Sequence, residues 1–215
     1  GNSITSGGNY NVVVGDEAGT AISTADYTTA IGYAAGTAVT TGVRQTLIGG
    51  LAGDALTTGD NNTAVGYNSL SAMTVGDRNV AVGVGTLAAA NVTSNADTYN
   101  TAVGFDAGND ITTGTKNTLI GGLAGDAITT GGANTAVGYS ALTTSTTGSN
   151  NTSIGRESLR VTTTGSNNVG VGSYAMYDNT TGGSNVAIGE SALSNNTTAS
   201  NNTAVGKSAL LANTT

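Results

Sequence analysis

Carboxylates and hydroxyls are the main side chains available for chemistry in this 215-residue sequence, which contains no Cys, His, Trp or Pro. That composition excludes thiol and imidazole catalysis, thiolate zinc sites and disulfide scaffolds. Asp60 and Asp77 occupy equivalent places in consecutive repeats, where their carboxylates could form a pair. A calcium site needs more oxygen ligands, and a glycosidase needs a cleft. We therefore interpret both as solvated turn carboxylates, and we expect no enzymatic activity, no catalytic residue, no metal site and no cofactor.

Aromatic residues recur directly after a glycine, at Tyr33, Tyr67, Phe105 and Tyr139. Exposed rings can stack on sugar faces, so Tyr33, Tyr67 and Tyr139 belong to a candidate receptor-binding set. The alternative is that these rings cover a corner of the fold or a seam between chains.

Adjacent threonines form a third pattern, at 40–41, 57–58 and 129–130. Threonine columns are also found on ice-binding surfaces. A flat ice-binding face needs Thr at alternate positions of one strand, whereas adjacent residues point to opposite sides. Ice binding is therefore kept only as an alternative.

The acidic balance of the chain restricts its partners. Six Lys and Arg against 13 Asp and Glu give a formal net charge of −7. Such a chain repels phosphate backbones and anionic membrane surfaces, which argues against a nucleic-acid partner. No apolar run approaches the ~20 residues that span a bilayer, so direct membrane insertion is not expected.

The elements that must position all these residues form a repeat. A glycine preceded by Val or Ile recurs every 17 residues, except for one interval of 21 residues between Gly83 and Gly104. We call each repeat a rung and each such residue a corner glycine. The corner glycines are Gly15, Gly32, Gly49, Gly66, Gly83, Gly104, Gly121, Gly138, Gly155, Gly172, Gly189 and Gly206.

The residue four places before the corner glycine is Asn in ten of the twelve rungs. Each rung therefore predicts one short strand that ends at the Val or Ile. We expect the Asn and the Gly at its two ends to adopt left-handed conformations, and Asn side chains in register can hydrogen-bond between rungs. Representative structural residues are Asn62, Val65 and Gly66, then Asn134, Val137 and Gly138, and then Asn185, Ile188 and Gly189.

Two places in each rung exchange large and small side chains. We call them the first and second filling positions, four and seven residues after the corner glycine. Gly125 at the first is paired with Ile128 at the second, whereas Leu159 is paired with Thr162. The rung of Leu70 is an exception. Packing at constant volume predicts one interior space per rung, filled from either position.

Residues 46–67 reappear almost unchanged at 118–139, which indicates that blocks of rungs have been copied. These rungs predict an all-β parallel β-solenoid, a β-roll of about twelve rungs and roughly 55 to 60 Å in length. On each strand, Asn and a small residue such as Ala share one face. This small-residue face suits close approach by another chain, so we expect self-association there, with a single-chain solenoid as the alternative.

The segments "NVAIGESA" at 185–192 and "NTAVGKSA" at 202–209 resemble the head repeats of trimeric autotransporter adhesins. The segment "NTAVGYSALTTSTTG" at 134–148 is similar to repeats of phage and bacterial tail-fibre proteins. The resemblance spans essentially the whole chain. It implies a left-handed β-roll assembled as an elongated homotrimer. It also implies an extracellular location, on the surface of a virion or a bacterial cell.

The four extra residues in the long interval predict a bulge at 88–100. Loops on rigid scaffolds often carry recognition, although such an insertion can also be merely tolerated. The candidate receptor-binding residues here are Asn91, Thr93, Asn95, Asp97 and Tyr99.

These patterns predict one repeat domain over residues 1–215. Because the sequence lacks an initial Met and stops within a motif, we expect it to be a fragment of a longer fibrous protein. Its expected function is that of a structural or adhesive fibre segment, as in a tail fibre or adhesin. Such a segment projects or forms a surface for attachment to a host-cell receptor or glycan. The alternative is a glycan-binding or ice-binding solenoid module.

Overall fold

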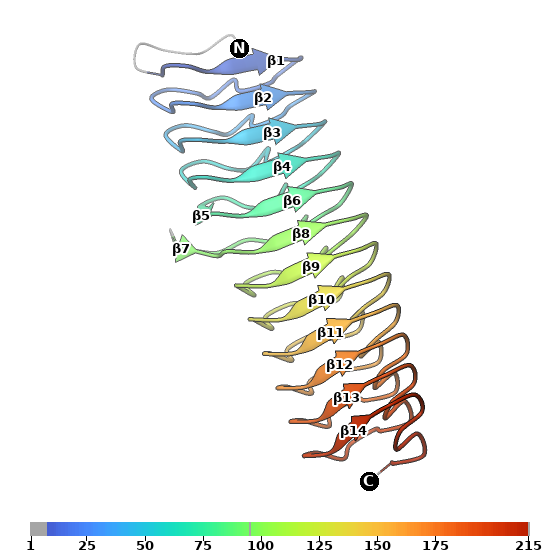
Figure 1. Ribbon diagram of the computed structural model, residues 1–215. Coiled ribbons are helices and arrows are strands. Elements are labelled where there is room, and N and C mark those ends of the chain that lie inside the picture. Colours follow the sequence, from blue (N-terminus) through green and yellow to red (C-terminus); the bar gives the residue numbers. More distant parts are fainter. Residues whose placement is uncertain (1–7, 95, 215) are drawn as a thin grey trace.

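The computed structural model describes residues 8–94 and 96–214 as a rod of stacked coils, with the two ends of the chain at opposite ends of the rod (Figure 1). One parallel sheet of 12 strands follows the order β1-β2-β3-β4-β6-β8-β9-β10-β11-β12-β13-β14. Their bounds are β1 Val12–Val14, β2 Thr29–Ile31, β3 Thr46–Ile48, β4 Thr63–Val65, β6 Val80–Val82, β8 Thr101–Val103, β9 Thr118–Ile120, β10 Thr135–Val137, β11 Thr152–Ile154, β12 Val169–Val171, β13 Val186–Ile188 and β14 Thr203–Val205. β5 (Gly76–Asp77) and β7 (Ala96–Asp97) form a second, two-stranded sheet.

Neighbouring strands pair without any shift in register. Thr135 lies opposite Thr152, and Val137 lies opposite Ile154, so equivalent residues of consecutive rungs form columns. The predicted all-β parallel β-solenoid with a 17-residue repeat is thereby confirmed. No helix occurs in the described part of the chain, and hence none there could cross a membrane.

The corner glycines allow the rungs to stack closely. Gly121 has a φ of +133°, and a Cβ built on it would lie 2.5 Å from the carbonyl oxygen of Gly138 in the next rung. Gly66, Gly138 and Gly189 share this arrangement, with φ between +134° and +138°. Any side chain here would meet both backbone strain and backbone atoms, so glycine is required at this corner.

The Asn column forms a buried ladder along the rod. The N–H of Asn151 donates to Oδ1 of Asn134 at 2.9 Å, and Nδ2 of Asn134 donates to the carbonyl oxygen of Gly148 at 2.9 Å. Equivalent bonds join Asn168 and Asn185. The expected left-handed conformation of these Asn residues is wrong, because it belongs to the residue before each of them, such as Ala133 with a φ of 57°. The Asn instead satisfies buried polar groups between rungs.

The small-residue face of the strands lines the interior of each chain. Ala64, Ala136 and Asn134 are fully buried, while the flanking Thr135 and Val137 point outward and remain partly exposed. The seam predicted on this face is therefore wrong, because the face is already covered by the chain itself. Most residues in the column of Ala64 and Ala136 are small, and Leu47 and Leu119 are fully buried in the same column.

The two filling positions occupy the same interior space. A Cβ on Gly125 would lie 2.8 Å from Cδ1 of Ile128, whereas Leu159 is fully buried beside a fully buried Thr162. The predicted exchange of volume is thus confirmed. In the exceptional rung, Leu70 and Met73 are both buried.

The long interval leaves the main sheet intact. β6 pairs directly with β8, with Val80 opposite Thr101, and the Asn ladder continues from Asn79 to Asn100. The extra residues lead to β7, which pairs with β5 beside the main stack (Figure 1). The predicted bulge is a lateral excursion of one rung.

Candidate interaction surfaces

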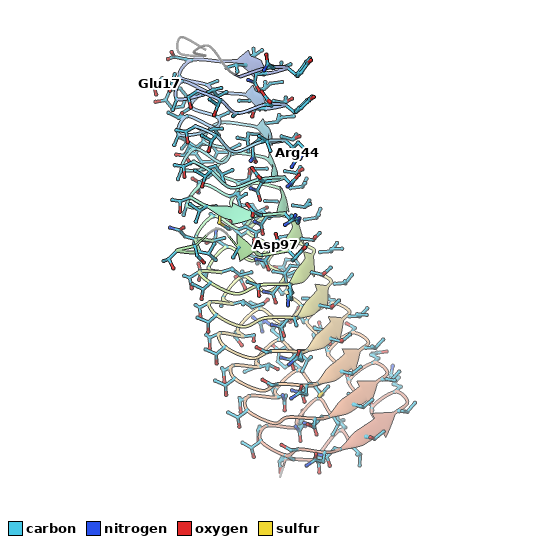
Figure 2. The ribbon with its side chains drawn as sticks, turned by 90° about the vertical axis from the view of Figure 1, so that its left-hand side faces the viewer. Glu17, Arg44 and Asp97 are labelled. Carbon is cyan, nitrogen blue, oxygen red and sulfur yellow. The ribbon has the colours of Figure 1, made fainter. Side chains whose placement is uncertain are left out.

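A column of β-branched apolar side chains runs along the outer face of the main sheet. It consists of the residue before each corner glycine, and we call it the outer column: Val14, Ile31, Ile48, Val65, Val82, Val103, Ile120, Val137, Ile154, Val171, Ile188 and Val205. Ile120 is 41% exposed and Ile154 is 40% exposed, although a residue of this kind is normally buried. Thr or Val two residues earlier points the same way, and side chains project outward from every strand of the stack (Figure 2).

The predicted aromatic residues lie on the surface just beyond the strands. Tyr33, Tyr67 and Tyr139 are 56%, 58% and 55% exposed, and Phe105 is 59% exposed. The negative charge of Glu17 near the Tyr33 hydroxyl raises the pKa of Tyr33. These rings are therefore accessible on the side of the corner glycines.

The described candidates of the bulge are mostly exposed. Asn91, Thr93, Asp97 and Tyr99 all reach the surface, whereas Asn95 lies outside the described residues. The Asn91 side chain accepts a hydrogen bond from the Thr74 hydroxyl at 2.9 Å. The bulge and the aromatic residues after the corner glycines lie at different corners of the rung, so the structure does not bring them into one site.

Arg78 lies beside the bulge and was not identified as a candidate from the sequence. Its guanidinium forms an ion pair with Asp97 and lies 5.7 Å from the centre of the Tyr99 ring. The Tyr99 hydroxyl also donates to Asp97 Oδ2 at 3.0 Å. Arg44, one of the residues labelled in Figure 2, occupies the equivalent place two rungs before Arg78. Only the pairing of β5 with β7 shows that Arg78 meets Asp97.

The threonine pairs do not form a continuous outer face. The hydroxyl of Thr40 donates to the carbonyl oxygen of Thr57 at 3.1 Å, and that of Thr129 donates to the carbonyl oxygen of Thr146 at 3.0 Å. The first Thr of each pair is thus half-buried and engaged between rungs. The second is exposed at Thr41 and Thr130 and half-buried at Thr58. This alternation agrees with the argument that adjacent threonines point to opposite sides.

The carboxylates of Asp60 and Asp77 accept hydrogen bonds from backbone N–H groups of the preceding rung. The N–H of Asp60 donates to Oδ1 of Asp77 at 2.6 Å, and the N–H of Val43 donates to Oδ1 of Asp60 at 2.8 Å. Ser149 and Ser166 occupy the same column and accept equivalent bonds. These carboxylates therefore tie turns together.

Two other carboxylates, Asp54 and Asp126, are unusual in their environment. They occupy the same place in the two copied blocks, and each has an Oδ1 atom that is buried without a hydrogen-bond partner. Burial raises the pKa of Asp126 to about 6, with further contributions from the nearby charges of Asp110 and Asp106. Burial also raises the pKa of Asp54. Both prefer the neutral form more than an ordinary aspartate does.

Within residues 8–94 and 96–214 the structure forms no pocket and no group of three or more potential metal-binding side chains. What it offers is long, regular surfaces. No protein-family model, no curated protein and no solved structure matches the chain. Its function must therefore be inferred from these surfaces.

Proposed function

We propose that this chain is a non-enzymatic segment of an extracellular fibre, in which several copies associate side by side. The observation that carries the proposal is the outer column, which is apolar in every rung and runs the length of the rod. Burying the remaining surface of one such residue contributes ~1 kcal/mol. Twelve of them on one face provide a large favourable term for a parallel assembly.

Three copies around a common axis fit the resemblance to adhesin heads and tail fibres. Each rod would turn its main sheet inward, so that outer columns meet along the axis. The aromatic residues and the bulge would then remain at the corners and sides, where they can contact a receptor or glycan. A virion or bacterial surface is the proposed location, and attachment to a host cell is the proposed role.

The first test is the native mass, measured by light scattering together with small-angle scattering. We expect an elongated particle with the mass of three chains. Ile120→Asp combined with Ile154→Asp should release single chains, since the charges would lie in the seam. Thr130→Asp is the matched control, because Thr130 is exposed elsewhere on the rung. A wild-type single chain would refute the fibre assembly.

The same face favours a second function, ice binding. Thr118 and Ile120 alternate on one outward-facing strand, and Thr135 lies directly beside Thr118 in the next rung. Each of these strands thus presents one outward Thr beside one outward Val or Ile, so the face carries a single continuous threonine column, which the adjacent threonine pairs do not form. A single-chain rod that shows thermal hysteresis, lost in Thr118→Lys and Thr135→Lys, would select ice binding over fibre assembly.

A further inference from the structure

The four aromatic residues after the corner glycines follow every second strand of the stack from β2 to β10. Tyr33 follows β2, Tyr67 follows β4, Phe105 follows β8 and Tyr139 follows β10. In the order of the main sheet, these strands are separated each time by one other strand, β3, β6 or β9 (Figure 1). The alternation persists across the bulge, although the sequence interval there is longer. We call these residues the aromatic ladder.

The rungs in between leave room beside the rings. Two of them carry glycine after the corner glycine, at Gly50 and Gly122. A Cβ on Gly50 would lie 3.4 Å from Cδ2 of Tyr67, and one on Gly122 would lie 3.7 Å from Cδ2 of Tyr139. Each of these rings therefore leans over the glycine of the preceding rung. The third intermediate residue is Val84.

The spacing of the ladder is fixed by the fold. Two strand separations place consecutive rings about 10 Å apart, and four rings cover about 30 Å of the rod. One disaccharide unit of an extended β-1,4-linked polysaccharide has a similar length, and its sugars present flat faces in a ribbon. Because every second sugar of such a ribbon faces the same way, each ring would meet an equivalent sugar face.

The charges around the ladder limit the kind of polysaccharide. The chain has a net charge of −7, and Glu17 and Asp106 flank the rings of Tyr33 and Phe105. The intermediate rungs place no cation beside the rings, and Arg156, in the rung directly after Tyr139, is paired with Glu157. An anionic polysaccharide would be repelled by this surface, whereas a neutral one would not.

We propose that the aromatic ladder binds an extended, neutral, β-1,4-linked polysaccharide of the cellulose or chitin type along the rod. This inference rests on the proposed function in one respect, namely that the fibre contacts a surface glycan along its length. The rings supply apolar contact to sugar faces, and polar neighbours such as Asn68 are placed beside them. The spacing of the rings, about 10 Å, thus favours a polymer whose disaccharide unit has a similar length.

The decisive experiment changes the spacing and keeps every ring. Deletion of residues 118–134 removes one whole rung and joins Asn117 to Thr135, which places Phe105 and Tyr139 on adjacent rungs. Deletion of residues 169–185 is the matched control, because it removes one rung outside the ladder and joins Asn168 to Val186. Circular dichroism and light scattering verify that both variants keep the wild-type fold and assembly.

Binding is measured by depletion from suspensions of microcrystalline cellulose and of chitin, with starch granules for comparison. We expect the wild type and the control deletion to bind at least one β-1,4-linked polymer, and not starch. The 118–134 deletion should bind at least ~10-fold more weakly. Tyr67→Ala and Tyr139→Ala should each weaken binding roughly threefold to tenfold. Tyr27→Ala, which removes a ring of equal exposure outside the ladder, should leave binding unchanged.

Absence of wild-type binding to both polymers would overturn the inference, and so would unchanged binding after the 118–134 deletion. Light scattering on the same samples separates this result from the fibre proposal. A three-chain rod that binds neither polymer refutes the ladder alone, and a single-chain rod that binds refutes the assembly alone.

Discussion

Two groups of rungs fill the same interior space from different positions of the chain: those that begin at Gly15 through Gly121, and those that begin at Gly138 through Gly206. In most of the first group, glycine stands at the first filling position and an apolar side chain such as Ile128 at the second. In the second group, Leu or Met stands at the first filling position and Ser, Thr or Asn at the second. The difference shows that the fold requires a volume in each rung, and does not require a particular residue to supply it.

The rungs with Leu or Met at the first filling position differ from the others in backbone conformation and in the polarity of the second filling position. Leu142 and Leu159 adopt left-handed conformations, with φ of 56° and 51°, which are unfavourable for a bulky residue. In return, the second filling position can hold polar groups. Asn179, Asn196 and Asn213 form a second ladder there, with Nδ2 of Asn196 donating to Oδ1 of Asn179 at 2.7 Å. The first group has no such ladder among its described residues, and it contains the half-buried carboxylates of Asp54 and Asp126 instead.

The largest expected effect concerns what both groups share, the corner glycine. Gly121→Ala should destabilise the fold by more than about 3 kcal/mol, because the Cβ would combine an unfavourable φ with a backbone clash. Gly122→Ala is the matched control, since its Cβ would meet only Cδ2 of Tyr139 at 3.7 Å. Urea denaturation of the two variants measures the difference. Equal stability would mean that the corner glycine is dispensable.

The next effect tests the exchange of volume directly. Leu159→Gly should cost about 2 to 4 kcal/mol through the cavity that it leaves. Adding Thr162→Ile should restore a large part of the lost stability. It gives the rung the pattern of the first group, with Gly and then an apolar residue at the filling positions, and it removes a buried hydroxyl without a hydrogen-bond partner. A double-mutant cycle in urea measures the coupling. Additive losses would contradict the shared interior space.

A smaller effect tests the second Asn ladder. Asn196→Ala should destabilise the fold by about 1 to 3 kcal/mol, because the buried Asn179 and the half-buried Asn213 lose their hydrogen bonds to it. Asn195→Ala changes the exposed neighbouring residue and should have little effect. Thermal denaturation compares the two. If both variants matched the wild type, the ladder would contribute nothing to stability.

The smallest effect is the pH dependence of the first group. Because the pKa of Asp126 is about 6 in the folded state, and thus above its unfolded value of 3.8, ionisation opposes folding at neutral pH. Asp126→Asn should therefore stabilise the fold at pH 7, by ~1 kcal/mol at most given the partial solvent screening. The gain should fall as the pH drops through 6 and should vanish below about pH 4. Denaturation across this range measures the gain, with the exposed Asp16→Asn as a control remote from Asp126. A gain independent of pH would contradict this origin.

The repeat alone predicted the fold class, the strand positions and the exchange between the filling positions, since each follows from strict register. The direction of the strand faces could not be predicted in the same way. A period of two separates Thr135 and Val137 from Asn134 and Ala136, and the usual rule would place the valine inside. In this fold the face with Asn and Ala points into the rung, where the filling positions supply the large apolar side chains, and the valines remain outside. The contact between Arg78 and Asp97 was equally hidden, because it depends on how the four extra residues fold.

Each rung makes its contacts almost entirely with the rung before it and the rung after it, and the corner glycines make all these junctions alike. A recombination event that duplicates or removes whole repeats therefore joins surfaces that already fit. The near-identity of residues 46–67 and 118–139 is a trace of such an event. The length of the rod can thus change in steps of about 4.8 Å per rung, because each added or removed repeat leaves the packing of the remaining rungs unchanged.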